Sequence, residues 1–416
     1  MSPFPADFFG SENIFLMLSR VFKYVLYFIP LFIAVLGWRF WVRHRNEEWI
    51  STIKWVMLEF RIPRDVFKSP RAMELALGNA LHQTGGVGTR YNKFWVGRVL
   101  AWFSLEIVST EGSIHFYIRT PKQFRNIIES QVYAQYPRAE IFEVEDYVLP
   151  VVKSMYEEEW SMWGCEFKLN KHDAYPIRTY VDYGLDKSAT STEDQESLID
   201  PIVSQLEWMG TMRKDEHFWL QIVVRASKDA YEGPGLFSTP VDWKARAKDE
   251  IKKMQDKYDS ADSIELLGKH LKMPKTEQEA IMAIERSMDK PVFDTGIRAI
   301  YLAKKGSFRS EHITGLTSIM RSYGSNNLNS FAPTKTTDFA NPWEDRTGDK
   351  KVELKKELLE SYIHRGFFYT PYRSQFFALT TEELATIFHF PGRVLATPTF
   401  KRIESKKSEP PINLPV

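Results

Sequence analysis

Cysteine is nearly absent from this sequence, because Cys165 is the only one among 416 residues. A single thiol cannot form an internal disulfide or a thiolate metal cluster, so we expect the body of the protein to lie in a reducing compartment. An excess of one charge is also missing, since 55 Lys and Arg stand against 54 Asp and Glu. The sequence therefore gives no overall attraction to nucleic acid, and such binding would need a local patch.

Motifs for catalysis and cofactor binding are missing as well. The glycine-rich stretch at 85–92 lacks the Lys-Ser/Thr pair of a phosphate-binding loop, and we interpret it as a flexible hairpin-like loop. The nine histidines are scattered and show neither an HExxH motif nor zinc-ligand spacing. We therefore expect a protein that is not an enzyme and that uses no cofactor and no metal.

The composition is that of a globular protein, with 43% hydrophobic and 26% charged residues. Aromatic residues are abundant at 14%. The length suggests two or three folded units rather than one.

An apolar segment near the N-terminus predicts a membrane anchor. Residues 24–38 carry no charge, and snorkelling of Lys23 and Arg39 would extend the segment to a transmembrane helix over about 21–42, within an N-terminal segment 1–46. A cleaved signal peptide and a buried helix are the alternatives. The positive charges that follow the segment favour a single-pass protein of the plasma (inner) membrane with a cytoplasmic C-terminal body.

Alternating apolar residues behind this segment predict strands, and capped apolar stripes predict helices. Residues 50–150 follow the order β-α-β-β-α-β of a ferredoxin-like module. A second such module is expected over 160–340, with a helical insertion at about 241–290. The predicted fold class is thus α+β, with a transmembrane helix followed by two ferredoxin-like modules.

The C-terminal part is expected to contain a helical and strand segment at 350–403 and a polar, proline-rich tail at 404–416. Thr380-x-x-Glu383 predicts a capping box that opens a short helix. This helix would place Leu384, Ile387 and Phe388 on one apolar face. These side chains either dock a partner or pack on the chain's own body.

Four aromatic residues lie opposite the apolar faces of their predicted strands: Trp55, Trp102, Tyr117 and Trp219. Exposed aromatics on a ferredoxin-like sheet can stack nucleic-acid bases. The alternative is that another part of the chain, or a neighbouring subunit, covers them.

Several segments resemble the region that precedes the motor domain in bacterial, membrane-anchored DNA-translocating ATPases of the conjugation type (TraD/TraG-like coupling proteins and HerA-like relatives). The segments that carry the resemblance are residues 67–77, 102–107, 174–184, 380–391 and 405–415. The most specific of them is the stretch that ends in Phe390 and Pro391. In these relatives the ATPase domain follows shortly after such an ending, whereas this sequence lacks it.

The resemblance implies a non-enzymatic scaffold or adaptor in a type IV secretion-like or conjugative translocation apparatus. Its expected partners are the membrane and a separate hexameric motor ATPase, and homo-oligomer formation stays open. The expected docking site for the motor comprises Leu384, Ile387, Phe388, Phe390 and Pro391. The alternative function is a membrane-tethered nucleic-acid-binding protein that uses the aromatic sheet faces.

Overall fold

The computed structural model describes residues 11–61, 68–83, 89–155, 158–186, 199–227, 243–259, 273–339, 341 and 343–391. The chain forms two compact units. The helical unit contains Met1–Ile53 and Gly85–Val99, and the sheet unit contains Lys54–Thr84 and Leu100–Val416. The N-terminal segment therefore shares its unit with a loop region that sequence analysis assigned to the first module.

The helical unit consists of a long helix and one short helix. Helix α1 spans Ser11–Thr52 and contains Pro30, and the π-helix η2 spans Asn92–Val96. No helix in the described part of the chain combines the length and the apolar character that crossing a membrane requires. The predicted transmembrane helix at about 21–42 is therefore a wrong assignment, because the uncharged run at 24–38 is shorter than the roughly 20 residues of a membrane span.

The sheet unit is built around one nine-stranded sheet, in which eight strands follow the order β4-β1-β3-β2-β6-β7-β5-β8 and β9 pairs with β7. Every registered strand pair is antiparallel. The strands are β1 (Trp55–Arg61), β2 (Trp102–Thr110), β3 (Ser113–Pro121), β4 (Glu140–Val144), β5 (Trp160–Leu169), β6 (Glu216–Ala226), β7 (Val292–Lys304), β8 (Phe331–Thr334) and β9 (Phe377–Thr380).

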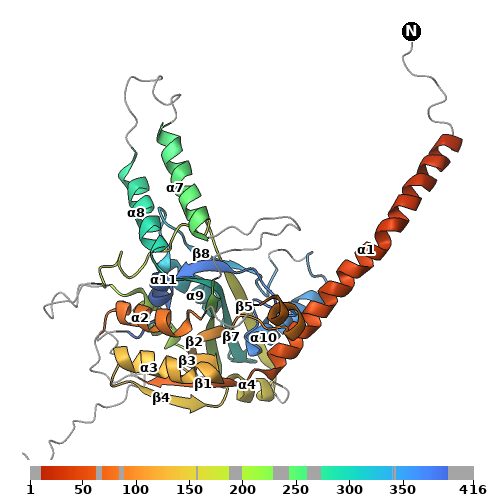
Figure 1. Ribbon diagram of the computed structural model, residues 1–416. Helices are drawn as coiled ribbons and strands as arrows, with labels where there is room; N and C mark the ends of the chain where they lie inside the picture. Colours follow the sequence, from red (N-terminus) through yellow and green to blue (C-terminus); the bar gives the residue numbers. More distant parts are fainter. Residues whose placement is uncertain are drawn as a thin grey trace, which may run out of the picture. The chain divides into compact units, whose positions relative to one another are not determined.

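Helices connect these strands and cover both faces of the sheet (Figure 1). The α-helices are α2 (Pro70–Leu81), α3 (Arg125–Gln135), α4 (Val148–Ser154), α6 (Pro201–Met209), α7 (Trp243–Asp259), α8 (Lys275–Met288), α9 (Glu311–Ile319), α10 (Asp349–Ile363) and α11 (Thr381–Ile387). Two short 3-10 helices, η3 (Lys122–Phe124) and η5 (Met320–Tyr323), precede α3 and follow α9. Helices α7 and α8 form a hairpin in the stretch where a helical insertion is expected.

The prediction of two separate ferredoxin-like modules is wrong. The elements of the first stretch do follow the order β1-α2-β2-β3-α3-β4. However, β2 also pairs with β6, from Trp102 opposite Arg225 to Thr110 opposite His217, so the two stretches share a single sheet. Strand β9, from the predicted C-terminal segment, adds a further strand beside β7. The pairing of β2 with β6 satisfies backbone N–H and C=O groups that two separate modules would leave unpaired at their edge strands. Of the predicted fold class, only the coarser α+β assignment is confirmed.

Alternation along the strands gives the sheet two different faces. One face, here called the apolar face, carries residues such as Leu105, Phe116 and Ile222, all of which are buried. Helices α2, α3, α6, α9 and α11 contribute to the same hydrophobic cluster. This face holds the main core.

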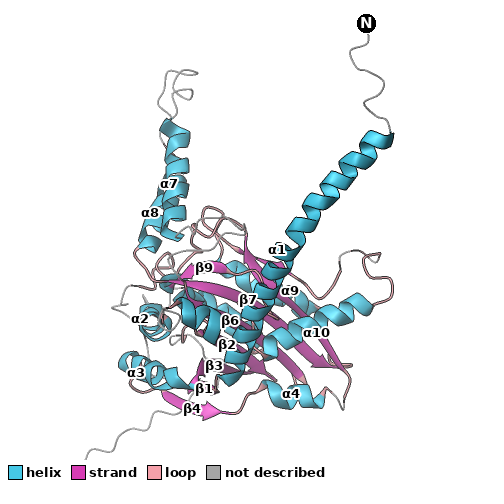
Figure 2. Cartoon of the chain, turned by 45° about the vertical axis from the view of Figure 1, so that its right-hand side comes forward, coloured by secondary structure: helices cyan, strands magenta, loops and turns pink. Residues whose placement is uncertain are grey.

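The opposite face, here called the polar face, is covered by α4 and α10, which lie across the strands in Figure 2. Val148 of α4 and Tyr362 of α10 pack there against Trp219. The strands also direct charged and amide side chains to this face, among them Glu106, Gln221 and Arg298, and all three are buried.

Candidate functional site at the C-terminal helix

Helix α11 starts with the capping box that the sequence predicts. The Thr380 side chain accepts a hydrogen bond from the Glu383 backbone N–H, and Glu383 Oε2 accepts one from the Thr380 N–H at 2.8 Å. This reciprocal pair satisfies N–H groups that would otherwise lack partners at the helix start. All seven residues of α11 are buried.

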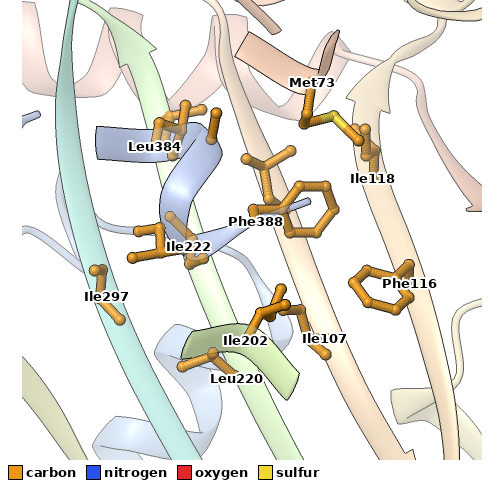
Figure 3. Packing of buried hydrophobic residues seen from close by; sticks show 14 of the residues in the cluster. Met73, Ile107, Phe116, Ile118, Ile202, Leu220, Ile222, Ile297, Leu384 and Phe388 are labelled. Atoms are coloured by element: carbon orange, nitrogen blue, oxygen red, sulfur yellow. The ribbon is translucent and has the colours of Figure 1, made fainter. Parts of the chain in front are cut away.

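The apolar side chains of α11 point into the sheet. Figure 3 shows Leu384 and Phe388 beside Ile222, Ile118 and Phe116 of the apolar face. The Phe388 and Phe116 rings have centroids 5.8 Å apart in an edge-to-face contact. Both the helix and the residues after it are therefore part of the main core.

The five residues expected to dock a motor are thus buried by the chain itself: Leu384, Ile387, Phe388, Phe390 and Pro391. Phe390 packs on Phe60, Phe116 and Tyr136, with ring centroids 6.2, 5.3 and 5.2 Å away. The structure matches the alternative in which the helix packs on the chain's own body. A short helix needs such packing, because seven residues are too few to be stable alone.

Three glutamates surround the start of α11. Glu382 accepts a 2.6 Å hydrogen bond from Thr179 Oγ1 and forms a 3.1 Å ion pair with Arg286 of α8. Glu74 of α2 forms a 2.6 Å ion pair with Lys290. The third, Glu383, accepts a hydrogen bond from the Ile177 N–H at 2.9 Å. The cluster thereby ties α11 to α2, to α8, to Lys290 two residues after α8, and to residues 174–186.

Burial changes the acidity of this cluster. Desolvation raises the pKa of Glu383 to about 7, although hydrogen bonds from Thr380 and Ile177 favour the ionised form. Desolvation also raises the pKa of Glu382, against the opposing effect of Thr179, Arg286 and Lys290. The carboxyl groups therefore hold the helix in place, and the neighbouring cations partly balance their charge.

The four aromatic residues of the predicted stacking surface lie on the polar face, as the strand alternation predicts, and pack against rings of the chain itself. Tyr117 stacks on Tyr147 at a centroid distance of 5.0 Å, and Trp219 stacks on Tyr362 at 5.3 Å. Trp102 and Trp55 pack against each other at 4.8 Å. Tyr117, Trp102 and Trp219 are buried.

The sequence did not reveal which contacts hold α10 and the residues after it on the polar face. Arg365, which is fully buried, forms hydrogen bonds with Glu106 at 2.9 and 3.1 Å and with Asp146 at 2.5 and 2.8 Å. Its backbone carbonyl also accepts a 3.1 Å hydrogen bond from Trp102 Nε1. Because 259 residues separate Arg365 from Glu106, no local pattern could have revealed this pair.

No group of His, Cys, Asp and Glu side chains within the described ranges has an arrangement that could hold a metal ion. Cys165 is buried, and burial raises the pKa of its thiol. The thiol is therefore neither exposed nor activated as a nucleophile.

Together, the fold and the site define an α+β protein whose C-terminal helix is built into the core of one antiparallel sheet. The chain belongs to the family described as a domain of unknown function, DUF8128, whose profile matches residues 93–402. This match extends from η2 past α11 and covers well over half of the chain. Comparison with curated protein sequences gives no match.

Proposed function

We propose that this protein is a non-enzymatic membrane component of a type IV secretion-like or conjugative translocation apparatus, and that it acts as adaptor or scaffold for a separate motor ATPase. The proposal begins with the resemblance of five segments to the region before the motor in conjugation-type ATPases. In the structure, several of these segments lie next to one another.

The observation that carries the proposal is that three of these segments meet around α11. They are α2, residues 174–184 and α11 itself. The Tyr180 N–H donates to Thr386 Oγ1 at 2.9 Å, its hydroxyl donates to Glu74, and Thr381 Oγ1 donates to Glu74 at 3.3 Å. A fourth segment, 102–107, lies in β2 of the same sheet.

This arrangement supports a role for the residues that follow α11. The chain is fixed up to Pro391 by contacts with the main core, so a partner bound beyond that point would be mechanically connected to the whole sheet. Residues 404–416 are polar and contain three prolines, a composition typical of extended segments that bind along a partner. We therefore assign motor docking to this tail rather than to the buried face of α11.

Membrane attachment is supported by the exposed apolar surface of α1. Phe28, Leu31, Phe32 and Ile33 each expose about 60% or more of their surface. Large exposed apolar surfaces mark sites of interaction with membranes or proteins. Full-length protein should float with lipid vesicles in a density gradient at neutral pH, and recovery in the lipid-free fractions would contradict membrane attachment.

The adaptor function can be tested by deleting residues 404–416 from the full-length protein. We expect the deletion to leave the melting temperature nearly unchanged but to reduce capture of a motor ATPase in detergent. A variant with the tail residues in scrambled order is the matched control, since it keeps the composition and length. Undiminished capture by the deletion variant, or failure of the full-length protein to capture any motor ATPase, would contradict the proposal.

A nucleic-acid-binding role for the aromatic residues is not favoured by a specific observation. Their rings pack on Tyr147, Tyr362, Tyr369 and one another. Bases could stack on them only if α4, α10 and the residues after α10 moved away.

A further inference from the structure

In the helical unit, η2 is fixed along one side of α1 by specific hydrogen bonds. Trp41 Nε1 donates to the Phe94 carbonyl at 3.2 Å, and Arg45 Nε donates to the Trp95 carbonyl at 2.8 Å. Gly97 has a φ of 77°, and a Cβ at this position would lie 2.2 Å from the Arg45 carbonyl oxygen. The close approach and the left-handed backbone both require glycine here.

Ring contacts place the aromatic residues of η2 at a defined level of α1. Phe94 packs on Trp38 at 5.5 Å, and Trp95 packs edge-to-face on Trp41 at 5.8 Å. This is the level at which the uncharged run of α1 ends and its arginines begin. The aromatic side chains of two separate segments thus form one cluster at that boundary.

The cluster is exposed and its surroundings are positively charged. Trp95 and Tyr91 expose 53% and 66% of their surface, and Phe40 of α1 exposes 68%. Residues 39–49 and 89–99 together contain six Lys or Arg residues and two Glu residues. The basic residues are Arg39, Arg43, Arg45, Arg90, Lys93 and Arg98. Both glutamates already form ion pairs within α1, with Arg43 and Arg45.

We propose that residues 38–45 of α1 and residues 90–98, which include η2, form one binding surface for anionic lipid headgroups, named here the headgroup surface. Its tryptophan and tyrosine rings would lie at the boundary between headgroups and acyl chains, where such amphipathic rings are favoured. Arg39, Arg90, Lys93 and Arg98 would contact lipid phosphates, while Arg43 and Arg45 remain paired with Glu47 and Glu48. Each basic residue near an anionic membrane strengthens the attraction. This inference rests on the proposed membrane attachment of α1.

A lipid bilayer fits this surface better than a protein does, because the headgroup surface continues directly into the apolar part of α1. Every residue from Phe28 to Gly37 is exposed, so apolar side chains point to all sides of the helix. A helix that is apolar on all sides is typically buried in a protein core or in lipid, and the basic residues beside this one favour an anionic lipid surface, which α1 would enter without crossing. The positive excess at the end of the apolar part then complements anionic headgroups.

The inference can be tested with an environment-sensitive fluorophore on single introduced cysteines in the full-length protein. Cys165 is buried, so the unsubstituted chain serves as the labelling blank. The test positions are Tyr91→Cys and Trp95→Cys on the headgroup surface. Phe32→Cys, in the exposed apolar part of α1 outside the headgroup surface, reports on membrane attachment of α1. Ser51→Cys lies ten residues beyond Trp41, roughly 15 Å further along the helix. Each variant is reconstituted into vesicles of phosphatidylcholine with and without added phosphatidylglycerol.

At positions 91 and 95 we expect a blue-shifted emission and protection from iodide, an aqueous quencher, and both effects should increase with phosphatidylglycerol. Position 51 should stay accessible to iodide. If position 32 is protected while 91 and 95 are as accessible as 51, the headgroup surface is refuted and membrane attachment stands. If position 32 is accessible as well, both proposals fail.

Two further outcomes would also overturn the inference. Protection at 91 and 95 that does not change with phosphatidylglycerol would refute recognition of anionic headgroups. Protection that rises with protein density in vesicles of constant lipid composition would indicate a second copy of this chain as the occupant.

Discussion

The two faces of the sheet are buried to a similar degree but by different chemistry. The apolar face is covered by helices whose apolar stripes complete one large hydrophobic cluster. The polar face buries Glu106, Arg298 and Arg365, and the side chains of both arginines have no exposed surface. Apolar contacts tolerate shifts in position, whereas a buried ion pair requires a defined geometry. The polar face therefore fixes where the segment after α10 lies on the sheet.

Polar-face arginines differ in how completely they are paired. Arg365 bonds to both Glu106 and Asp146. Arg298 donates to the Gly366 carbonyl at 2.6 Å, lies over the Phe367 ring at 4.7 Å and is 3.7 Å from Glu166. Burial lowers the pKa of Arg298 to about 10, while the carboxylates raise that of Arg365 above its usual value. Arg365 is thus the more strongly coupled residue.

The largest loss in the free energy of unfolding is expected for Arg365→Met. The substitution leaves Glu106 buried without its cation, and breaking a buried pair from one side costs about 3–5 kcal/mol. Chemical denaturation of the sheet unit in the full-length chain should show this loss. Restoring part of the stability with Glu106→Gln in the same chain would confirm the coupling.

Arg125→Met is the matched control on a solvent-exposed ion pair. Arg125 pairs with Glu129 at 2.7 Å, and its side chain is one-third exposed. Exposed pairs contribute about 0–1 kcal/mol. Equal losses in the two arginine variants would show that the polar face has no special role.

This comparison also shows which parts of the structure the sequence could predict. Alternation in β2 and β6 correctly separates Leu105 and Ile222 from Glu106 and Gln221, and the Thr380 capping box correctly locates α11. From alternation alone, however, one would expect Glu106 and Gln221 to be exposed to water. Its burial depends on α10 and the following residues, more than 140 positions from Gln221 and 259 from Glu106.

The same limit applies to the candidate site. The apolar spacing of Leu384, Ile387 and Phe388 correctly indicates a shared face, but spacing cannot show whether that face meets a partner or the chain's own core. The contact of η2 with α1 joins residues about fifty positions apart, and two backbone carbonyls accept its hydrogen bonds. Backbone acceptors leave no signal in the sequence.

A somewhat smaller loss of stability than for Arg365→Met is expected for Phe116→Ala on the apolar face. Phe116 is 1% exposed and packs edge-to-face on Phe388 and Phe390. Truncation removes this burial and leaves a cavity, at a cost on the order of 3 kcal/mol. The midpoint of thermal unfolding should fall accordingly, and an unchanged midpoint would mean that the contact with the residues after α11 adds no stability.

The smallest expected effect is a change in pH dependence when Glu383 is replaced by Gln. Glu383 has an ordinary pKa of 4.5 when unfolded and a pKa of about 7 when buried in the fold. At this site the folded state therefore binds more protons than the unfolded state between these values, and the contribution of Glu383 to stability falls as the pH rises from 4.5 to 7. Burial lowers the pKa values of His217, His312 and His364 from 6.5, and these groups act within the same window in the opposite direction. The effect of Glu383 is therefore measured as the difference between the pH profiles of wild type and variant.

Glu383→Gln cannot ionise and keeps only one of the two acceptor oxygens, so its NH2 group faces the N–H of either Thr380 or Ile177 and stability falls at every pH. The slope with pH, rather than the absolute stability, is therefore the readout. We expect the variant to lose a stability difference on the order of 2 kcal/mol between pH 4.5 and 7, as each pKa unit corresponds to about 1.4 kcal/mol. Unfolding by urea at several pH values would measure the slope in both proteins. Glu279→Gln, an exposed residue of α8, is the matched control and should leave the slope unchanged. Parallel pH profiles for wild type and Glu383→Gln would show that the carboxyl group is ionised in the fold without cost, and the raised pKa would then be refuted.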